Sequence, residues 1–328
     1  MTGGLARAIL GRLAAAAALF ISVATIMFTT LAALPGDAVS ARLGASATPE
    51  TTAALRQQLG LNRSAPERLW RLLRGIPTAD LGTSAMSGGS VWDEIRTPVV
   101  NSMLLGLASL LLVVVASITL GTLAGRKPGS RLDRALSAVV LGGLALPEFV
   151  IGTTIVGVLA LWLGWLPAVS LVPLSGTPLD DPAILVIPAL TVALVAGCWA
   201  TRYVRAAVAS VAAERFVESA RLAGLPERTV VLRYLLPAAI GQIAQVQALV
   251  IGYLVGGTVV VERLVAYPGL GSRLVTAVTD RDEPVVLGAG LILAAFVIAV
   301  LAIANVISVI SNPKMRRVPV GSALLSTT

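Results

Sequence analysis

Six long apolar stretches constrain the fold of this chain more than any other feature of its sequence. A helix needs about 20 apolar residues to cross the hydrocarbon of a bilayer. The hydrocarbon contains no water, so each stretch must satisfy its own backbone polar groups, which favours a helix. The stretches are residues 13–34, 99–125, 136–163, 183–204, 238–261 and 285–310. We therefore predict an all-α polytopic membrane protein with six transmembrane helices.

The composition agrees with a chain that exposes little surface to water. Charged residues are 13% of the sequence, whereas soluble domains carry about 25%. The formal charge is +8, and the basic residues lie between the apolar stretches, so we expect them to face membrane lipid rather than nucleic acid. The chain has no His and one Cys, Cys198, which excludes an internal disulfide and a metal site built from Cys and His.

Basic residues in the short connecting segments predict the orientation, because Lys and Arg are enriched on the cytoplasmic side. The segments assigned to that side carry Arg7, Arg12, Arg126, Lys127, Arg131, Arg134, the basic residues within 202–233, Lys314, Arg316 and Arg317. The loop after the third stretch has no Lys or Arg. We predict that both termini are cytoplasmic. The first stretch is too long for a cleaved signal peptide, so we interpret it as a helix.

Residues 35–98 form a long segment on the opposite, extracytoplasmic side, and two short helices are predicted within it. Thr48 is a candidate N-cap that precedes a proline and an acid, and this helix should end at Gly60. Ser64 and Glu67 have the spacing of a capping box for a second helix that ends near residue 75. The segment could cap the helix bundle or could form part of a docking surface for an outside partner.

The cytoplasmic loop between the fourth and fifth stretches, residues 205–237, is unusually long. Its pattern predicts an amphipathic helix over 206–223, a turn at Gly224 and a second helix that starts at Pro226 and ends near Pro237. Glycine adopts the positive φ of such a turn readily, and proline suits the first helical turn. No phosphate-binding or catalytic pattern is present, so the loop is best suited to fit a groove on another protein.

Within this loop, Glu218-Ser219-Ala220, Gly224 and the run that ends at Pro237 have a characteristic spacing. It resembles the EAA loop of the membrane subunits of binding-protein-dependent ABC importers. Ser219 departs from the family pattern at its second position, and Tyr234 departs at the usual Ile position. The resemblance implies a set of residues that couple this chain to an ATPase: Glu214, Glu218, Ser219, Ala220, Arg221, Gly224, Pro226 and Pro237.

Further motifs narrow the resemblance to the B-type permease subunit of dipeptide and oligopeptide importers. They are Leu34-Pro35-Gly36-Asp37, Asp80-Leu81-Gly82, Tyr267-Pro268-Gly269-Leu270-Gly271, Arg281-Asp282-x-Pro284 and Asn312-Pro313-Lys314. The resemblance implies the type I permease fold of ABC importers, in a bacterial inner membrane. The implied organisation is an N-terminal tail and first helix (1–34), an extracytoplasmic segment (35–98), a permease core (99–317) and a cytoplasmic tail (318–328).

The resemblance also implies partners. A second, C-type permease would complete the pore, two ATPase subunits would dock in the cytoplasm, and an extracytoplasmic binding protein would deliver a peptide. The chain lacks the glycine-rich phosphate loop of ATPases, so ATP and Mg²⁺ are expected in the partner subunits and no cofactor in this chain. Relatives in this family carry nickel or glutathione, so these solutes are alternatives to a peptide. A self-contained secondary transporter is a further alternative, whereas an enzyme such as an intramembrane protease lacks a matching residue set.

Two sites outside the loop are predicted with alternatives. The turn-rich stretch after the fifth helix is expected to close the outer mouth or meet the binding protein, through Glu262, Tyr267, Pro268, Gly269 and Gly271. The alternative for this stretch is a plain hairpin between two helices.

The second site is Glu148, which follows Pro147 about 12 residues into the third stretch, near mid-membrane at about 1.5 Å per residue. A carboxylate is costly in lipid, so Glu148 should face the bundle interior or a water-filled cavity. It could line the transport pathway and attract the ammonium group of a peptide. It could instead pair with a group on a neighbouring helix or be protonated. Pro147 could kink the helix toward the cavity.

Overall fold

The computed structural model describes residues 2–33, 48–58, 63–172 and 176–311. Contacts between residues divide the chain into two compact units. Unit 1 comprises Met1–Leu13, Leu104–Tyr267 and Val300–Thr328, and unit 2 comprises Ala14–Met103 and Pro268–Ala299. Several predicted features lie outside the described residues: the motif at 34–37, the helix end at Gly60, the motif at 312–314 and the tail 318–328.

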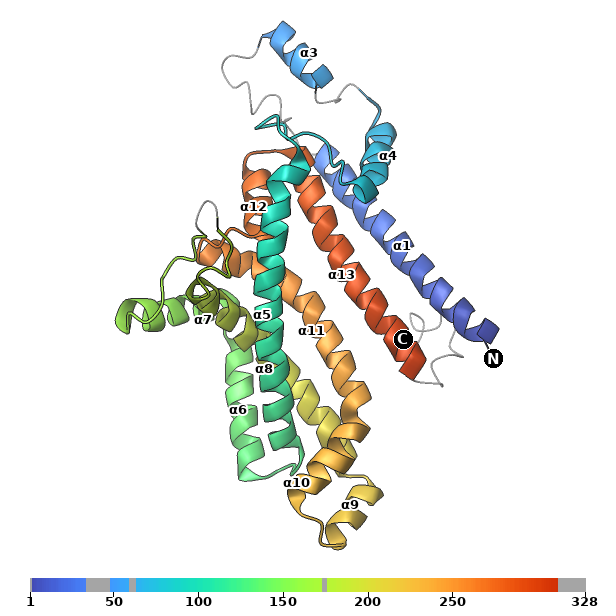
Figure 1. Cartoon of the computed structure of the whole chain (residues 1–328), viewed down its shortest axis with the longest axis vertical. Coiled ribbons are helices and arrows are strands. Elements are labelled where there is room, and N and C mark those ends of the chain that lie inside the picture. The colour runs from blue at the N-terminus through green and yellow to red at the C-terminus, as the bar shows by residue number, and fades with distance from the viewer. Residues whose placement is uncertain (1, 34–47, 59–62, 173–175, 312–328) are drawn as a thin grey trace. The chain divides into compact units, whose positions relative to one another are not determined.

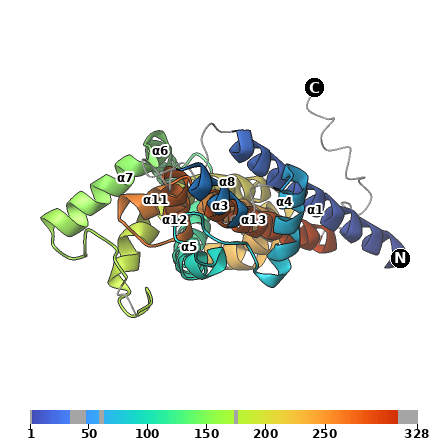
Figure 2. The same cartoon turned by 90° about the horizontal axis from the view of Figure 1, so that it is seen from above.

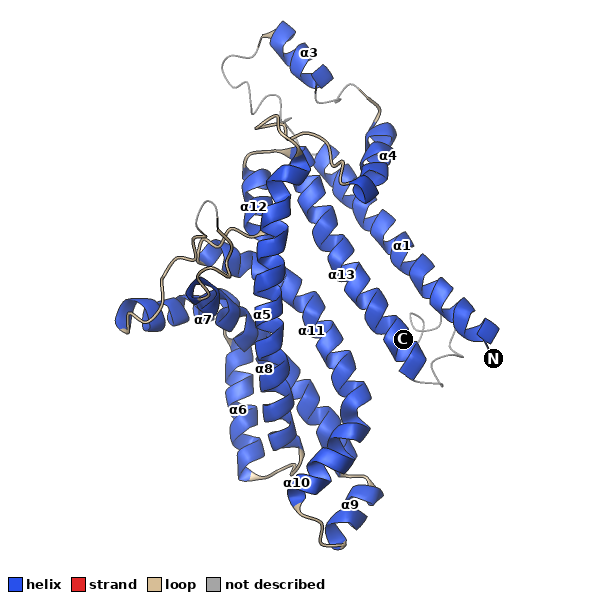
Figure 3. Cartoon of the chain, in the orientation of Figure 1, coloured by secondary structure: helices blue, strands red, loops and turns tan. Residues whose placement is uncertain are grey.

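The described residues are helical almost throughout and contain no β-strand, which confirms the predicted all-α class (Figure 3). An isolated antiparallel bridge joins Thr83 and Ser90. In chain order the helices are α1 (Thr2–Ala33), α3 (Pro49–Gln58), α4 (Ala65–Gly75), η2 (Ile76–Thr78), α5 (Val91–Gly125), α6 (Arg131–Ala145), α7 (Glu148–Ile155), η3 (Val156–Trp162), α8 (Ala183–Ala212), α9 (Arg215–Leu222), α10 (Glu227–Val230), η4 (Val231–Leu235), α11 (Leu236–Leu264), α12 (Leu270–Thr279) and α13 (Glu283–Ser311) (Figure 1).

Five helical segments are long and apolar enough to cross a membrane: Ile9–Leu31, Val91–Gly125, Ala183–Ala212, Glu227–Leu264 and Glu283–Ile303. A bent pair, formed by α6 with α7 and η3, provides a sixth span when it is counted as one. The chain is therefore a multi-pass membrane protein. Several helices extend beyond the apolar stretches that predicted them. In particular, α5 begins within the segment that was predicted as extracytoplasmic.

The third predicted span is broken at Pro147 and is not a single kinked helix. The axes of the helices before and after Pro147 differ by 101°. Proline lacks a backbone N–H and disfavours a helical conformation in the residue before it. Leu146 accordingly has extended angles, φ −94° and ψ 135°. Both views show α7 turning aside from the direction of α6 (Figures 1 and 2).

Helix α8 is central to unit 1, where it packs against α6, α7 and α11. A face of small and β-branched residues, which includes Ala196, Ala200 and Val204, is buried along it. Glycines on α5 allow that helix to approach α8 closely, because a Cβ on Gly125 would lie only 2.7 Å from the carbonyl oxygen of Arg205. Small residues allow such close approach of membrane helices.

The two short helices predicted within 35–98 are present, but one cap differs. Thr48 caps α3, since its Oγ1 accepts a 3.2 Å hydrogen bond from the backbone N–H of Thr51. Ser64 is the N-cap of α4, as predicted, yet its side chain makes no capping hydrogen bond. Glu67 instead accepts a 3.0 Å hydrogen bond from Arg63. The predicted capping box is therefore wrong, because the nearby guanidinium engages the glutamate.

A buried carboxylate organises unit 2. Asp282 is fully buried at the start of α13 and accepts hydrogen bonds from the loop that precedes α5. The donors are the Ser84 hydroxyl at 2.5 Å, the Ala85 N–H at 3.0 Å and the Met86 N–H at 3.4 Å. Two motifs that are about 200 residues apart in sequence, Asp80-Leu81-Gly82-x-Ser84 and Arg281-Asp282-x-Pro284, thus meet at one carboxylate.

Replacing Asp282 by Ala should destabilise unit 2 by about 2–3 kcal/mol, because buried donors on the 84–86 loop would lose their acceptor. Thermal unfolding of the purified chain in detergent would measure the loss. Asp280→Ala is the control, since Asp280 is exposed two residues away. Equal melting temperatures for the two variants would contradict a stabilising role for the buried carboxylate.

Candidate functional site

The predicted coupling loop folds into a helix–turn–helix at the end of two membrane-length helices. Helix α8 ends at Ala212, and Glu214 is the N-cap of α9, with extended angles of φ −74° and ψ 142°. Gly224 follows α9 with a φ of +76°, as the turn prediction requires. Pro226 is the N-cap of α10, one position before the predicted one. The single helix predicted over 206–223 is wrong, because the chain breaks between α8 and α9.

Helix α9 has one buried face and one exposed face. Val217 and Ala220 are 0% and 6% exposed and belong to the hydrophobic core of unit 1. On the other face, the side chain of Leu222 is 82% exposed and that of Phe216 is 45% exposed. The buried face fixes α9 to the membrane helices, while the exposed face offers apolar contact area beside Glu218 and Ser219, which are also exposed.

Arg221 ties α9 to its surroundings. Its Nη2 donates to the backbone oxygen of Arg126 at 2.9 Å and to Glu227 Oε1 at 3.2 Å. Arg221 therefore pairs with Glu227 across the Gly224 turn and not with Glu218, which lies on the same helix. Sequence reasoning did not identify Arg126 as part of this site, since its proximity to Arg221 depends on the tertiary fold.

Pro237 does not end a helix, contrary to the prediction. Helices α10, η4 and α11 form one membrane-length segment, and Pro237 lies at the second residue of α11. A proline inside a helix lacks an N–H and clashes with the carbonyl four residues earlier. The π-helical segment η4, which ends at Leu235, widens the backbone just before Pro237. This wider turn accommodates the proline without a break.

The predicted outer-gate residues are mostly interior residues. In unit 1, Glu262 and Tyr267 are both 0% exposed. The Tyr267 N–H donates to the Glu262 carbonyl at 2.8 Å. Burial, together with the charge of Glu262, raises the pKa of the Tyr267 phenol above its ordinary value. These two residues therefore contribute to packing in this chain rather than to its surface.

The rest of that stretch belongs to unit 2. The Pro268 carbonyl accepts a 2.9 Å hydrogen bond from Asn101 Nδ2. Gly269 is the N-cap of α12, and Gly271 is buried in its first turn. In chain order the short helix α12 separates α11 from α13, so the connection is not the plain hairpin that was the alternative.

Glu148 is the first residue of α7, directly after the break at Pro147. Its Oε1 atom is buried without a hydrogen-bond partner in the described structure, and the Tyr253 phenol of α11 interacts with the carboxylate. Gly257, one turn further along α11, makes room for it, since a Cβ there would lie 3.0 Å from Oε1. Glu148 therefore faces a neighbouring helix, as a carboxylate in an apolar span should.

The ion pair between Asp133 and Arg205 was not anticipated from the sequence. Asp133 is 2% exposed, and the Arg205 guanidinium donates to both of its oxygens, at 2.5 Å and 2.7 Å. The ion pair joins the start of α6 to the last part of α8, which precedes α9 in the chain. In the sequence, Asp133 stands alone among the basic residues of 126–134, which could have indicated an ion pair. Its partner Arg205 is 72 residues away, so the sequence did not identify it.

Arg221→Ala should loosen the turn between α9 and α10, because it removes the contacts to Arg126 and Glu227. The pair is about a third exposed, so we expect a stability loss of only about 1 kcal/mol. Hydrogen exchange should be faster at residues 215–227 than in the native chain. Arg228→Ala is the matched control, because Arg228 is exposed and makes no ion pair among the described residues. Unchanged exchange in the Arg221 variant would contradict the assignment.

Comparisons with known proteins place these features in a family. Residues 117–317 match the family described as the binding-protein-dependent transport system inner membrane component, and residues 5–94 match its N-terminal domain. The glutathione transport system permease protein of Escherichia coli (strain K12) is 29% identical over 294 residues, covering 90% of this chain and 94% of the relative. A protein of Brucella abortus (strain 2308), provisionally named a peptide transport system permease protein, is 29% identical over 308 residues, covering 94% of this chain and 98% of the relative. This chain belongs to the family of binding-protein-dependent transport system inner membrane components and has the type I permease fold of ABC importers.

Proposed function

We propose that this chain is the B-type membrane subunit of an ATP-driven peptide importer. In this proposal it forms half of the translocation pore with a second, C-type permease. Two ATPase subunits bind ATP and Mg²⁺ and hydrolyse ATP, while an extracytoplasmic binding protein delivers the peptide. The chain itself is non-catalytic. The observation that carries the proposal is the helix–turn–helix of α9 and α10, which presents exposed apolar residues beside a positive-φ glycine.

The coupling segment is suited to transmit motion from an ATPase. Leu222 and Phe216 offer exposed apolar area that a groove on the ATPase would cover. Val217 and Ala220 fix the opposite face of α9 to the core between α8 and α11. A displacement of α9 would therefore move the ends of two membrane helices. Basic residues gather at the end of the helices next to α9 and α10. Because Lys and Arg are enriched on the cytoplasmic side, they favour a cytoplasmic position for the α9–α10 segment and for both termini.

Gly224→Val should uncouple ATP hydrolysis from uptake. The native φ of +76° costs other L-residues about 1–2 kcal/mol, and a β-branched residue is the least compatible with it. The turn should then change shape, so that ATP is hydrolysed without transport. Uptake and hydrolysis would be measured together in vesicles that contain the complete transporter.

Gly224→Asn is the matched control, because Asn adopts positive φ more readily than Val. No atom would lie within 4 Å of a Cβ at this position, so steric contact cannot explain a difference between the variants. Normal uptake by the Val variant would refute the coupling role.

Glutathione is the second candidate solute, because a relative with 29% identity is named for glutathione transport. Glutathione is itself a modified tripeptide, so a peptide pathway has suitable chemistry for it. Competition of glutathione, dipeptides and longer peptides for uptake into the same vesicles would rank the candidates. Nickel and a self-contained secondary transporter remain alternatives; transport by this chain alone, without ATPase subunits, would favour the secondary transporter.

We also propose that the stretch around residues 262–271 helps to close the outer mouth or meets the binding protein. Tyr267 is buried and would be a poor cross-linking site, whereas Ala266 is exposed beside it, with a φ of +52°. A cross-linker at Ala266 should therefore reach the second permease or the binding protein in at least one nucleotide state.

Glu148 is proposed to line the peptide pathway, because its Oε1 has no partner within the described structure. A cation from the transported peptide would compensate the carboxylate. Glu148→Gln keeps the shape and removes the charge, so it should lower uptake of free-amine peptides about tenfold relative to N-acetylated ones, which corresponds to about 1.4 kcal/mol.

Uptake of both peptide classes by the Glu148→Gln transporter would be measured across pH. An unchanged ratio in an assembled transporter would refute the pathway role. Failure to assemble would favour a structural role for Glu148 at the contact with Tyr253 and Gly257.

A further inference from the structure

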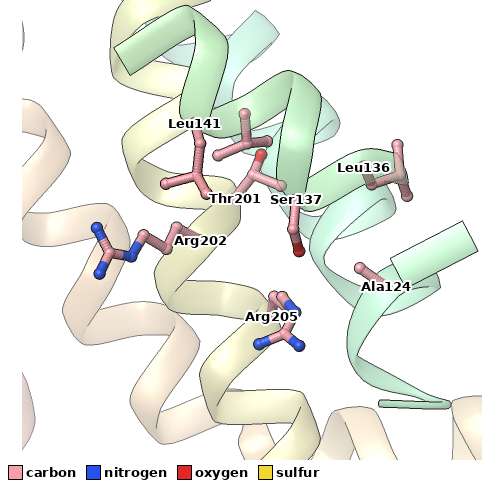
Figure 4. Close-up of a pocket in the computed structure, with 8 residues that line it drawn as sticks. Ala124, Leu136, Ser137, Leu141, Thr201, Arg202 and Arg205 are labelled. Carbon is pink, nitrogen blue, oxygen red and sulfur yellow. The ribbon is translucent and has the colours of Figure 1, made fainter. Parts of the chain in front are cut away.

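A pocket of about 250 Å³ lies between the end of α5, the middle of α6 and the last part of α8, all within unit 1. Its lining combines apolar and polar residues. The apolar residues are Ala124, Leu136, Val140 and Leu141, and the polar residues are Ser137, Thr201, Arg202 and Arg205 (Figure 4). Pockets for drug-sized molecules are roughly 300–1,000 Å³, so this one suits a smaller polar group.

The pocket lies at the ends of two apolar stretches, since Ser137 is near the start of the stretch 136–163 and Arg205 follows the stretch 183–204. Ser137 is six residues beyond the start of α6, and Arg205 is seven residues before the end of α8. At about 1.5 Å per residue, both are about 10 Å from the helix ends. The adjacent surface of α6 is apolar, with Leu141 54% exposed and Val139 71% exposed. A surface of this kind faces acyl chains more readily than water.

The charges around the pocket favour an anion. Asp133 is the acid between residues 126 and 146, and Arg205 already neutralises it. Arg205 uses Nε and Nη2 for that pair, which leaves Nη1 without a hydrogen bond within the described structure. Figure 4 shows the Ser137 hydroxyl directed toward the Arg205 side chain. Five basic residues nearby in the fold make no ion pair with another described residue: Arg126, Lys127, Arg131, Arg134 and Arg202.

We propose that this pocket binds the phosphate of an anionic phospholipid headgroup, with the acyl chains lying along the exposed apolar side of α6. Arg205 Nη1 donates to the phosphate, and the Ser137 hydroxyl donates to it in place of its long, 3.4 Å hydrogen bond to Asp133 Oδ1. Arg202, whose guanidinium is turned away from Ser137 in Figure 4, supplies an uncompensated charge from the rim. Basic pockets between membrane helices on the cytoplasmic side bind anionic headgroups in this way. The site is independent of which solute the transporter carries.

Native mass spectrometry of the purified, delipidated full chain would test the proposal. The chain would be incubated separately with phosphatidylglycerol, with phosphatidylcholine of the same acyl composition and with inorganic phosphate. We expect one tightly retained phosphatidylglycerol per chain and a higher melting temperature with that lipid alone. Equal retention of the two lipids would overturn the proposal, and saturation by inorganic phosphate at similar concentrations would assign the site to the free anion instead.

Two matched pairs of variants locate the site. Ser137→Leu fills the pocket without changing any charge and should reduce lipid retention about tenfold, whereas Ser137→Ala should reduce it much less. Arg202→Gln should weaken retention severalfold, while Arg228→Gln, which removes an exposed charge outside the pocket, should not. Equal losses for the two arginine variants would indicate diffuse charge attraction and overturn the assignment.

The last measurement is lipid retention in the assembled transporter. A phospholipid that belongs to this pocket should remain bound when the partner subunits are present. Loss of the bound lipid on assembly would show that another subunit covers this face of α6, which would also overturn the proposal.

Discussion

The absence of water from the bilayer hydrocarbon is the constraint on which this structure depends, because each spanning segment must satisfy its own backbone polar groups. Prolines show how strictly the constraint acts. Pro98 and Pro188 lie inside α5 and α8 without interrupting either helix. Before Pro237, the π-helical segment η4 widens the backbone, so the proline fits within the helix although it lacks an N–H. Only at Pro147, among the prolines within these spans, does the chain turn by 101°.

Residues on either side of Pro147 contribute to the break. Gly142 and Gly143 weaken the end of α6, since glycine lowers helical stability by about 1 kcal/mol relative to alanine. Glu148 then places a carboxylate in the first turn of α7, where a negative charge is favourable. The break brings Glu148 against Gly257 and Tyr253 of α11. It thus places a carboxylate within an apolar span.

Two arginines join the α9–α10 segment and the helices next to it within unit 1. Arg221 on α9 binds the backbone oxygen of Arg126 at the end of α5, and Arg205 on α8 binds Asp133 on α6. The loop between α5 and α6 is therefore held from two neighbouring helices. Because Arg221 also binds Glu227, the turn at Gly224 is held at both ends. Any displacement of α9 would act on α5, α6 and α8 together, and the buried face of α9 adds apolar packing to these polar contacts.

The sequence alone determined the all-α class, the number of apolar spans and the positive-φ turn at Gly224, because these follow from local periodicity, length and the special conformations of glycine. It did not determine which prolines break a helix, since that depends on neighbouring packing. Tertiary structure also decided that Glu262 and Tyr267 are buried, that Arg221 pairs with Glu227 rather than Glu218, and that Asp133 meets Arg205. Asp133 and Arg205 are 72 residues apart, and local patterns carry no information about a contact over that distance in sequence. Arg221 and Glu227 are close in sequence, but their contact depends on the shape of the turn at Gly224, and the burial of Glu262 and Tyr267 depends on how the helices pack.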